Sequence, residues 1–410
     1  MSKKCKQGCH FNRRDFLKIA GGTASGALFL NVSPNIVYAK TSSSDNLHVV
    51  DGYNPEVISA WIPINESESC YDLFKEVVER SSDFTWLSPG DTVFLKLSIN
   101  SGNKYPATTD PWALKCMIQL LNEKGAGEII VGDQSGVEHV LWTDKIKRGS
   151  SRKLCESSGL LKVIEDFGAT PYFFEEQGFN SYIKVKPSTS QHHWKDSMYI
   201  ADIINDVDHI IYLPRVGSHI MGDISCGMKI AVGFLRDDSR LKLHQGGKNF
   251  YAMYEEINEV SQIKSKLRLI VSSGREVIST VGPDYGYTSK PDFGLICASS
   301  DILANELLAY SWLEWNRKHK TPYGDKIIGN LRSRFRSIFN RLLVIVYFYG
   351  VRGKKYFTPV MPVYQPGNIY NHPSIANFIK RKGGKPESIQ WVTVNENPDS
   401  SIVQYMSKLL

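Results

Sequence analysis

Two hydrophobic periodicities alternate along residues 57–315, and together they predict strands separated by helices. Short and almost wholly apolar runs between turn residues are typical of buried strands, while apolar residues spaced three or four apart predict amphipathic helices. The predicted strands are 57–64, 92–97, 128–131, 171–174, 208–214, 267–272 and 293–299. The predicted helices are 71–80, 111–124, 152–167 and 302–315.

The clearest unit is the stretch that joins the strands 92–97 and 128–131. Asp110 can cap a helix that has Pro111 at its first position, and Gly125 can end it. A strand–helix–strand unit of this kind is typical of a parallel sheet. We therefore predict an α/β fold with a doubly wound, mostly parallel, Rossmann-like sheet.

The predicted fold indicates where a ligand would bind, and the sequence also indicates how the chain is divided. Ligands of such sheets bind at the carboxyl ends of the strands, so the loops after Leu97, Val131, Leu213 and Ala298 are candidate site loops. The predicted divisions are a targeting segment at 1–39, an α/β domain at 40–320 and a basic C-terminal extension at 321–410.

The first 39 residues have the three parts of an export signal. Arg13 and Arg14 precede an uncharged apolar stretch at 19–32, and small residues end the segment at 37–39. The paired arginines, followed by Phe-Leu-Lys, resemble the twin-arginine consensus, which is read by a receptor. This resemblance implies that the twin-arginine translocase exports the chain already folded, and that the mature protein is periplasmic. Folded export is often used for proteins that carry a cofactor.

The positive charge of the whole chain does not indicate a nucleic-acid partner. The formal net charge is +7, but six of the 49 Lys and Arg residues and one of the 42 Asp and Glu residues lie in the targeting segment. The rest of the chain is therefore only about +2, which excludes a general nucleic-acid-binding surface. Cysteine spacing likewise excludes an iron–sulfur run or a zinc ribbon, since no Cys-x-x-Cys pair occurs.

One basic stretch remains at 316–355, with eleven Lys or Arg residues and a single acid, Asp325. It contains the apolar run 342–349, which is too short to span a bilayer. One interpretation is binding to an anionic membrane surface or to an acidic partner. The other is a buried segment flanked by a solvated basic face.

Several residues that suit ligand binding follow the strand 208–214. His219 lies in a loop with Gly217 and Gly222, and glycines let a backbone approach a ligand closely. Cys226, Lys229 and His244 follow along the chain. Imidazole and thiolate suit a soft divalent metal, so His219, His244 and Cys226 are candidate metal ligands. Lys229 suits an anionic substrate or cofactor, and ordinary hydrogen-bonded loop residues are the alternative for both histidines.

A second candidate loop follows the strand 128–131 and reads Gly132-Asp133-Gln134-Ser135-Gly136. Asp133 is either a metal ligand or base, or a cap of the next helix. Together with Lys96 at the end of the neighbouring strand, Ser135 and Gly136 are candidate cofactor-binding residues. The candidate catalytic residues are His219, Lys229 and Asp133.

Four segments in 90–315 together resemble the domain of unknown function 362 family. They are the strand carrying Lys96, the Gly132–Gly136 turn, Leu213-Pro214-Arg215-Val216-Gly217-Ser218-His219, and Gly227-Met228-Lys229-Ile230-Ala231-Val232-Gly233. The family usually has Lys-Pro-Asn at the first segment and Leu-Pro-Lys-x-Lys-Thr-His at the third, so this chain departs at Leu97, Ser98 and Gly217. The fold that the resemblance implies agrees with the predicted α/β sheet.

A fainter resemblance is to the nickel-pincer lactate racemases. A strand, a histidine loop, a glycine-lysine segment and a later histidine occur in the same order here, at 208–213, His219, Gly227–Lys229 and His244. The resemblance implies that Lys229 holds an organometallic cofactor and that His244 binds nickel. The paired glycines that precede the lysine in that family are missing from this chain.

Two classes of function follow from these observations. The leading hypothesis is an exported α/β protein that binds a divalent metal, a metal-containing cofactor or an anionic cofactor at one strand-end site, for oxidoreductase or isomerase chemistry. In that hypothesis Lys96 and Lys229 hold anionic groups, and Asp133 orients a ligand or water. The alternative is a non-enzymatic accessory or scaffold protein that binds a membrane or a partner through 316–355.

Overall fold

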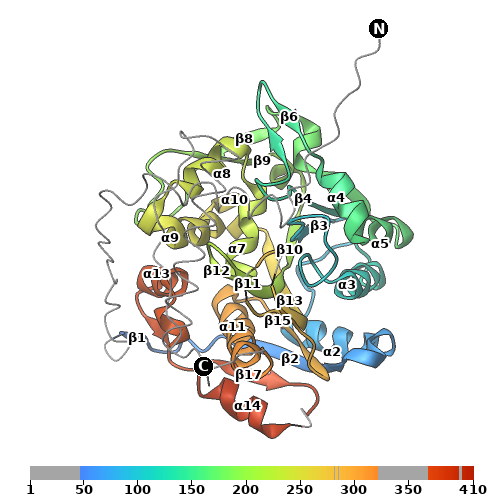
Figure 1. The fold of residues 1–410 in the computed structure, drawn as a ribbon, viewed down its shortest axis with the longest axis vertical. Helices are drawn as coiled ribbons and strands as arrows, with labels where there is room; N and C mark the ends of the chain where they lie inside the picture. The colour runs from blue at the N-terminus through green and yellow to red at the C-terminus, as the bar shows by residue number, and fades with distance from the viewer. Residues whose placement is uncertain (1–46, 281, 285, 322–367, 397–398) are drawn as a thin grey trace, which may run out of the picture.

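The computed structural model describes residues 47–280, 282–284, 286–321, 368–396 and 399–410 (Figure 1). The targeting segment, most of the basic stretch and the apolar run 342–349 lie outside these residues. Within the described residues no helix is both long enough and apolar enough to cross a membrane.

A large mixed sheet with a mostly parallel centre forms the middle of the molecule. Its main path runs β17-β2-β15-β13-β10-β3-β4-β7, and β11, β12 and β14 attach to it. The path consists of β17 (Gln390–Thr393), β2 (Glu56–Pro63), β15 (Phe293–Ser299), β13 (Leu267–Ile278), β10 (His209–Leu213), β3 (Thr92–Leu97), β4 (Glu128–Asp133) and β7 (Thr170–Phe173). The attached strands are β11 (Arg215–His219), β12 (Asp223–Ser225) and β14 (Thr288–Ser289).

Parallel pairing links β13, β10, β3, β4 and β7 in succession. The predicted α/β fold with a mostly parallel sheet is thus confirmed. Smaller two-stranded sheets are formed by β1 (Val49–Val50) with β16 (Lys385–Pro386), β5 (Leu141–Trp142) with β6 (Lys147–Arg148), and β8 (Tyr182–Val185) with β9 (Met198–Ala201).

Helices cover both faces of the large sheet, and each face has its own apolar core. One core includes α2 (Tyr71–Ser81), α3 (Pro111–Glu123), α4 (Ser151–Ser158) and α5 (Leu160–Asp166). The other includes α6 (Ile203–Asp206), α7 (Gly227–Ile230), α8 (Asp237–His244), α9 (Phe250–Glu255), α10 (Ser261–Lys264) and α11 (Ile302–His319). Figure 1 shows these two groups of helices on opposite sides of the sheet.

Capping residues set the helix boundaries as the sequence predicts. The carboxylate of Asp110 accepts a hydrogen bond from the Trp112 amide, and Pro111 occupies the first helical position of α3. Asp301 accepts hydrogen bonds from the amides of Leu303 and Ala304 at the start of α11. Both caps satisfy amide groups that have no partner inside the helix.

Two sequence predictions are wrong in detail. The single helix predicted at 152–167 is two helices, because Gly159 adopts a left-handed φ of 85° between α4 and α5. The loop after Ala298 is not at the site edge of the sheet, because β15 runs antiparallel to both β13 and β2. The carboxyl end of β15 therefore lies beside the start of β13.

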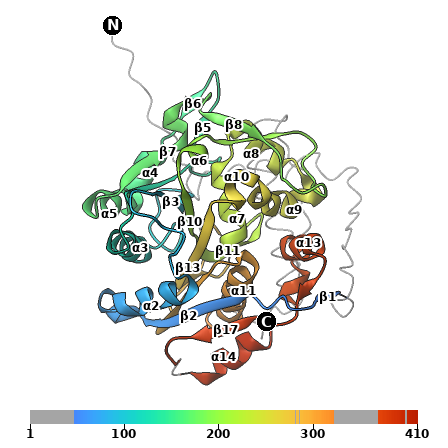
Figure 2. The same ribbon diagram turned by 180° about the vertical axis from the view of Figure 1, so that it is seen from behind.

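The end of the chain completes the sheet and its core. β17 adds a parallel strand beside β2, and α13 (Pro373–Lys382) and α14 (Ser400–Ser407) pack on the side of α11 (Figure 2). Arg381 on α13 pairs with Glu255 and Glu259, both buried on neighbouring segments. The described residues of 368–396 and 399–410 thus contribute side chains to the same core as the α/β domain, across the boundary predicted at residue 320.

Candidate functional site

A buried ion pair joins the carboxyl ends of two adjacent strands, β3 and β4. Lys96 Nζ lies 2.5 Å from Asp133 Oδ1, and both side chains are almost fully buried. Asp133 Oδ2 accepts a hydrogen bond from the Ile99 amide at 2.7 Å, and Lys96 Nζ also donates to the Leu97 carbonyl at 2.8 Å. Burial lowers the pKa of Lys96, and the charge of Asp133 acts in the opposite direction. Asp133 therefore provides the counter-charge for the buried ammonium group of Lys96.

Gly233, just before α8, and Arg240, on α8, pack against the region of this ion pair. A Cβ at Gly233 would lie 2.0 Å from Asp133 Oδ1 and 2.2 Å from Lys96 Nζ, so no side chain fits there. Buried Arg240 donates to the carbonyls of Gln134 at 2.7 Å and of Gly233 at 2.8 Å. Arg240 thereby ties the loop after β4 to the segment that precedes α8.

A β-hairpin made by β11 and β12 follows β10 and carries the predicted histidine loop. Arg215, at the start of β11, is fully buried and donates to the carbonyls of Pro106 at 3.3 Å and of Ser218 at 3.2 Å. Its Nε has no hydrogen-bond partner among the described residues. Burial lowers the pKa of Arg215 to about 10.

Half-buried His219 ends β11, and its ring orientation is fixed. Nδ1 accepts hydrogen bonds from the amides of Met221 and Gly222, both at 3.1 Å. Burial, together with the positive charges of Lys229 and Arg215, lowers the pKa of His219 well below its usual value. The ring is therefore neutral near pH 7 with its proton on Nε2, which makes Nε2 a hydrogen-bond donor.

Lys229 lies on α7, beyond the hairpin, with its aliphatic chain against Gly222. A Cβ at Gly222 would lie 3.1 Å from both Cδ and Cε of Lys229, so the glycine makes room for the side chain. Burial, then the charges of Arg215 and Arg240, lower the pKa of Lys229 to about 7. No described residue forms a hydrogen bond or an ion pair with its ammonium group.

We call Lys96, Arg215, Lys229 and Arg240 the cation cluster. Among the described residues, only Lys96 of these four has a carboxylate within 4.0 Å. Charges taken out of water are costly unless they are paired, so this cluster carries positive charge that an anion would stabilise. Figure 1 shows that β10, β11, β12 and α7, which carry or flank this cluster, lie together near the centre of the molecule.

Cys226 is buried beside Ser272, with 3.4 Å between Sγ and Oγ. Burial and the nearby carboxyl of Glu306 raise the pKa of Cys226 well above its usual value. Burial likewise raises the pKa of Glu306 to about 7, while its Oε2 accepts a hydrogen bond from the Met228 amide at 2.8 Å. Without a bound metal ion, Cys226 is thus a protonated thiol.

His219, His244 and Cys226 do not form a group of three ligand atoms within 4.8 Å of one another in the described part of the chain. A metal on His219 Nε2 would require the ring proton on Nδ1, but that atom already accepts two amide hydrogen bonds. His244 Nδ1 lies 2.7 Å from the Arg240 carbonyl, which leaves Nε2 as the coordinating atom of that ring. One available histidine with several cations nearby is a poor environment for a divalent ion.

Ser135 and Gly136 lie in the loop that follows β4. The Ser135 hydroxyl is buried without a hydrogen-bond partner among the described residues, which makes it available to a ligand. A Cβ at Gly136 would lie 3.0 Å from the Asn100 carbonyl, so its role is close backbone packing. The structure thus brings Lys96, Asp133, Lys229 and His219 into one charged region around this loop.

Sequence reasoning overlooked Arg215, Glu306 and the loop residue Asp284. Arg215 follows Pro214 at the end of a predicted strand, and a charged residue at that position indicates a candidate ligand-binding residue. Glu306 lies inside a helix that the sequence shows as mainly apolar, and a buried carboxyl there was a second signal. Asp284 had no local pattern, because only the folded sheet places it beside Arg215 and Ser101.

Comparison with known proteins agrees with the sequence resemblance. The model of the family described as "Domain of unknown function (DUF362)" matches residues 93–311, and the chain belongs to this family. The matched region contains the whole cation cluster. No curated protein matches the chain.

Two solved structures resemble the chain weakly. A Thermotoga maritima protein, solved in a structural genomics programme, has a TM-score of 0.35 and 11% identity over 51% of this chain and 50% of its own. The lactate racemase apoprotein of Thermoanaerobacterium thermosaccharolyticum has a TM-score of 0.42 and 10% identity over 87% of this chain and 86% of its own. The second is from the family named by the faint sequence likeness. At such scores neither structure carries an argument about activity.

The buried ion pair gives a testable consequence for stability. Asp133→Asn would leave Lys96 buried without its counter-charge, and we expect a loss of about 3–5 kcal/mol in the free energy of unfolding. Asp144→Asn, at an exposed position in the same loop region, should change it by less than about 0.5 kcal/mol. Denaturant unfolding of both variants measures the difference, and equal stabilities would contradict the assigned role of Asp133.

Proposed function

We propose that the chain binds a small anionic ligand, bearing a carboxylate or phosphate group, beside the cation cluster. The observation that carries this proposal is Lys229, whose half-buried side chain has no carboxylate within 4.0 Å of its ammonium group among the described residues and has the buried guanidinium groups of Arg215 and Arg240 nearby. An anion between these groups would stabilise charges that the protein leaves uncompensated. Arg215 and His219 Nε2 supply further donors.

The same residues suit proton transfer on the bound ligand. A lysine with a pKa of about 7 can hold or release a proton at neutral pH, which an ordinary lysine cannot. Such a group can act as a general acid or base, and an isomerase or an oxidoreductase of an anionic substrate uses this chemistry. Of the ligands in the leading hypothesis, the contacts of the cation cluster favour an anion.

Replacement of Lys229 tests the proposal directly. Calorimetric titration with inorganic phosphate, pyrophosphate and oxalate should detect binding of at least one of these anions to the purified chain. Lys229→Met should weaken that binding at least about tenfold, since a charged hydrogen bond of roughly 1.5–3 kcal/mol is lost. Lys248→Met, at an exposed position, is the matched control. Anion binding that survives Lys229→Met would refute the assignment.

The pH dependence of anion binding provides a second test. Binding requires protonated Lys229, so affinity should be constant below pH 7 and should fall by up to about tenfold per pH unit above the pKa of about 7. Lys229→Arg should bind without this slope, because arginine stays protonated. If the slope persists unchanged in Lys229→Arg, another group controls binding.

We further propose that the mature protein works in the periplasm after twin-arginine export. The support is the sequence at 1–39, where Arg13 and Arg14 precede an apolar stretch. Replacing both arginines by lysine should retain the chain in the cytoplasm of its host, as cell fractionation would show. Replacing Lys3 and Lys4 by glutamine, in the same basic region, should leave export intact. Continued export of the Arg13→Lys, Arg14→Lys variant would count against the twin-arginine route.

A further inference from the structure

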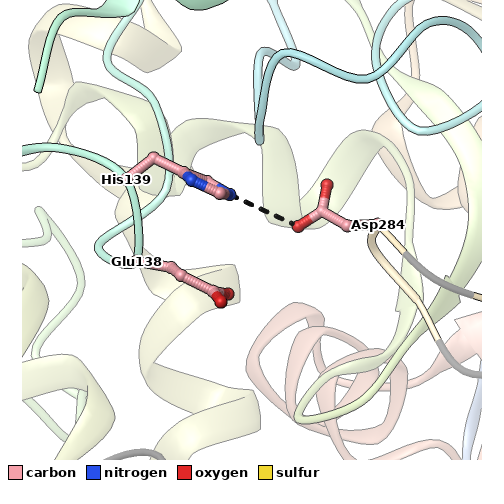
Figure 3. A group of neighbouring side chains, drawn as sticks. All are labelled: Glu138, His139 and Asp284. Atoms are coloured by element: carbon pink, nitrogen blue, oxygen red, sulfur yellow. Dashed lines mark ion pairs between the residues drawn. The ribbon is translucent and has the colours of Figure 1, made fainter. Parts of the chain in front are cut away.

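Three potential metal ligands lie together outside the cation cluster. Glu138 and His139 belong to the loop after β4, and Asp284 belongs to the loop between β13 and β14 (Figure 3). One ligand atom from each residue lies within 4.8 Å of the other two. The loops are far apart in the sequence, so the fold of the sheet brings them together.

The spacing between His139 and Asp284 fits a bridging ion better than a direct hydrogen bond. Nε2 of His139 lies 3.7 Å from Oδ2 of Asp284, beyond the usual hydrogen-bond range of about 2.7–3.2 Å. This Nε2 atom is buried and has no hydrogen-bond partner among the described residues. Two ligands each about 2.1 Å from a tetrahedral zinc ion are separated by roughly 3.4 Å.

A hydrogen bond from Ser101 orients the Asp284 carboxylate so that one oxygen is left for a metal ion. Oδ1 of Asp284 accepts a hydrogen bond from the Ser101 hydroxyl, which fixes the carboxylate and leaves Oδ2 facing His139. Supporting hydrogen bonds of this kind orient the ligands in metal sites.

We propose that Glu138, His139 and Asp284 bind a divalent cation of the zinc class. Imidazole nitrogen and carboxylate oxygen are both ligands of such ions, and three protein ligands leave a position for water or substrate. Glu138 is exposed, and His139 and Asp284 are partly buried. This site uses no residue of the cation cluster and does not depend on the proposed anion binding.

Zinc titration of the full chain tests the site. After chelator treatment and dialysis, competition with a chromophoric chelator should show one Zn²⁺ ion bound per chain with micromolar affinity or better. His139→Ala and Asp284→Asn should each weaken binding at least about tenfold, as the loss of a ligand would. His48→Ala, at an exposed position near β1, and Asp144→Asn, at an exposed position between β5 and β6, are the matched controls. Weaker binding in the controls, or none by the unaltered chain, would overturn the proposal.

Two further measurements keep the test independent of folding and of the anion site. Glu138→Gln changes an exposed side chain, so it should weaken Zn²⁺ binding without altering the circular dichroism spectrum. Lys229→Met should retain the bound Zn²⁺ while losing the anion. Full Zn²⁺ affinity in Glu138→Gln would remove that residue from the site, and loss of Zn²⁺ in Lys229→Met would place the ion elsewhere.

Discussion

The ion pair between Lys96 and Asp133 is the contact around which the strand-end region is built. It joins the ends of β3 and β4, and the Ile99 amide and the Leu97 carbonyl complete its hydrogen bonds. Gly233 passes so close that no side chain could replace its hydrogen. A buried pair contributes little to stability by itself, but it makes the loss of either partner costly. The arrangement of the neighbouring loops is fixed as a consequence.

A second buried ion pair holds the hairpin that carries His219. Arg317 on α11 donates to the Asp223 carbonyl at 2.8 Å and to Ser218 Oγ at 2.8 Å, and its guanidinium also pairs with the Asp223 carboxylate. Asp223 adopts a left-handed φ of 58°, which is uncommon for a residue with a side chain. Arg317 on α11 thus holds the hairpin of β11 and β12 in place. Arg215 and Lys229, by contrast, have no carboxylate within 4.0 Å among the described residues.

The contrast between paired and unpaired charges is the main argument for a ligand. Arg317, Arg275 and Arg381, whose side chains are at most 12% exposed, each have a carboxylate partner. Arg215 and Lys229 depart from that pattern at the carboxyl ends of parallel strands, where ligands of α/β sheets bind. Departures of this kind are expected at functional sites.

Local sequence signals predicted much of the fold, because strands and caps depend on neighbouring residues. The helix after Asp110 and the strand at 92–97 were correctly predicted from the cap and from the apolar run. The direction of β15 could not be predicted, because strand pairing depends on contacts between distant segments. For the site, Lys96 and His219 lie at or next to the ends of β3 and β11, and Lys229 lies on α7, while their role in binding stays a prediction. The tautomer of His219, the protonated state of Cys226 and the position of Asp284 depend on tertiary contacts that one sequence does not encode locally.

The most direct measurement is the pKa of Lys229 in the folded chain. Carbon NMR of labelled lysine side chains reports this pKa, and the signal missing from the Lys229→Arg variant identifies Lys229. We expect titration near pH 7 without ligand, and a clear upward shift when a bound anion such as phosphate stabilises the ammonium group. If the pKa of Lys229 is instead near the ordinary lysine value of 10.5 and does not change when anions are added, the proposed anion site at Lys229 is wrong.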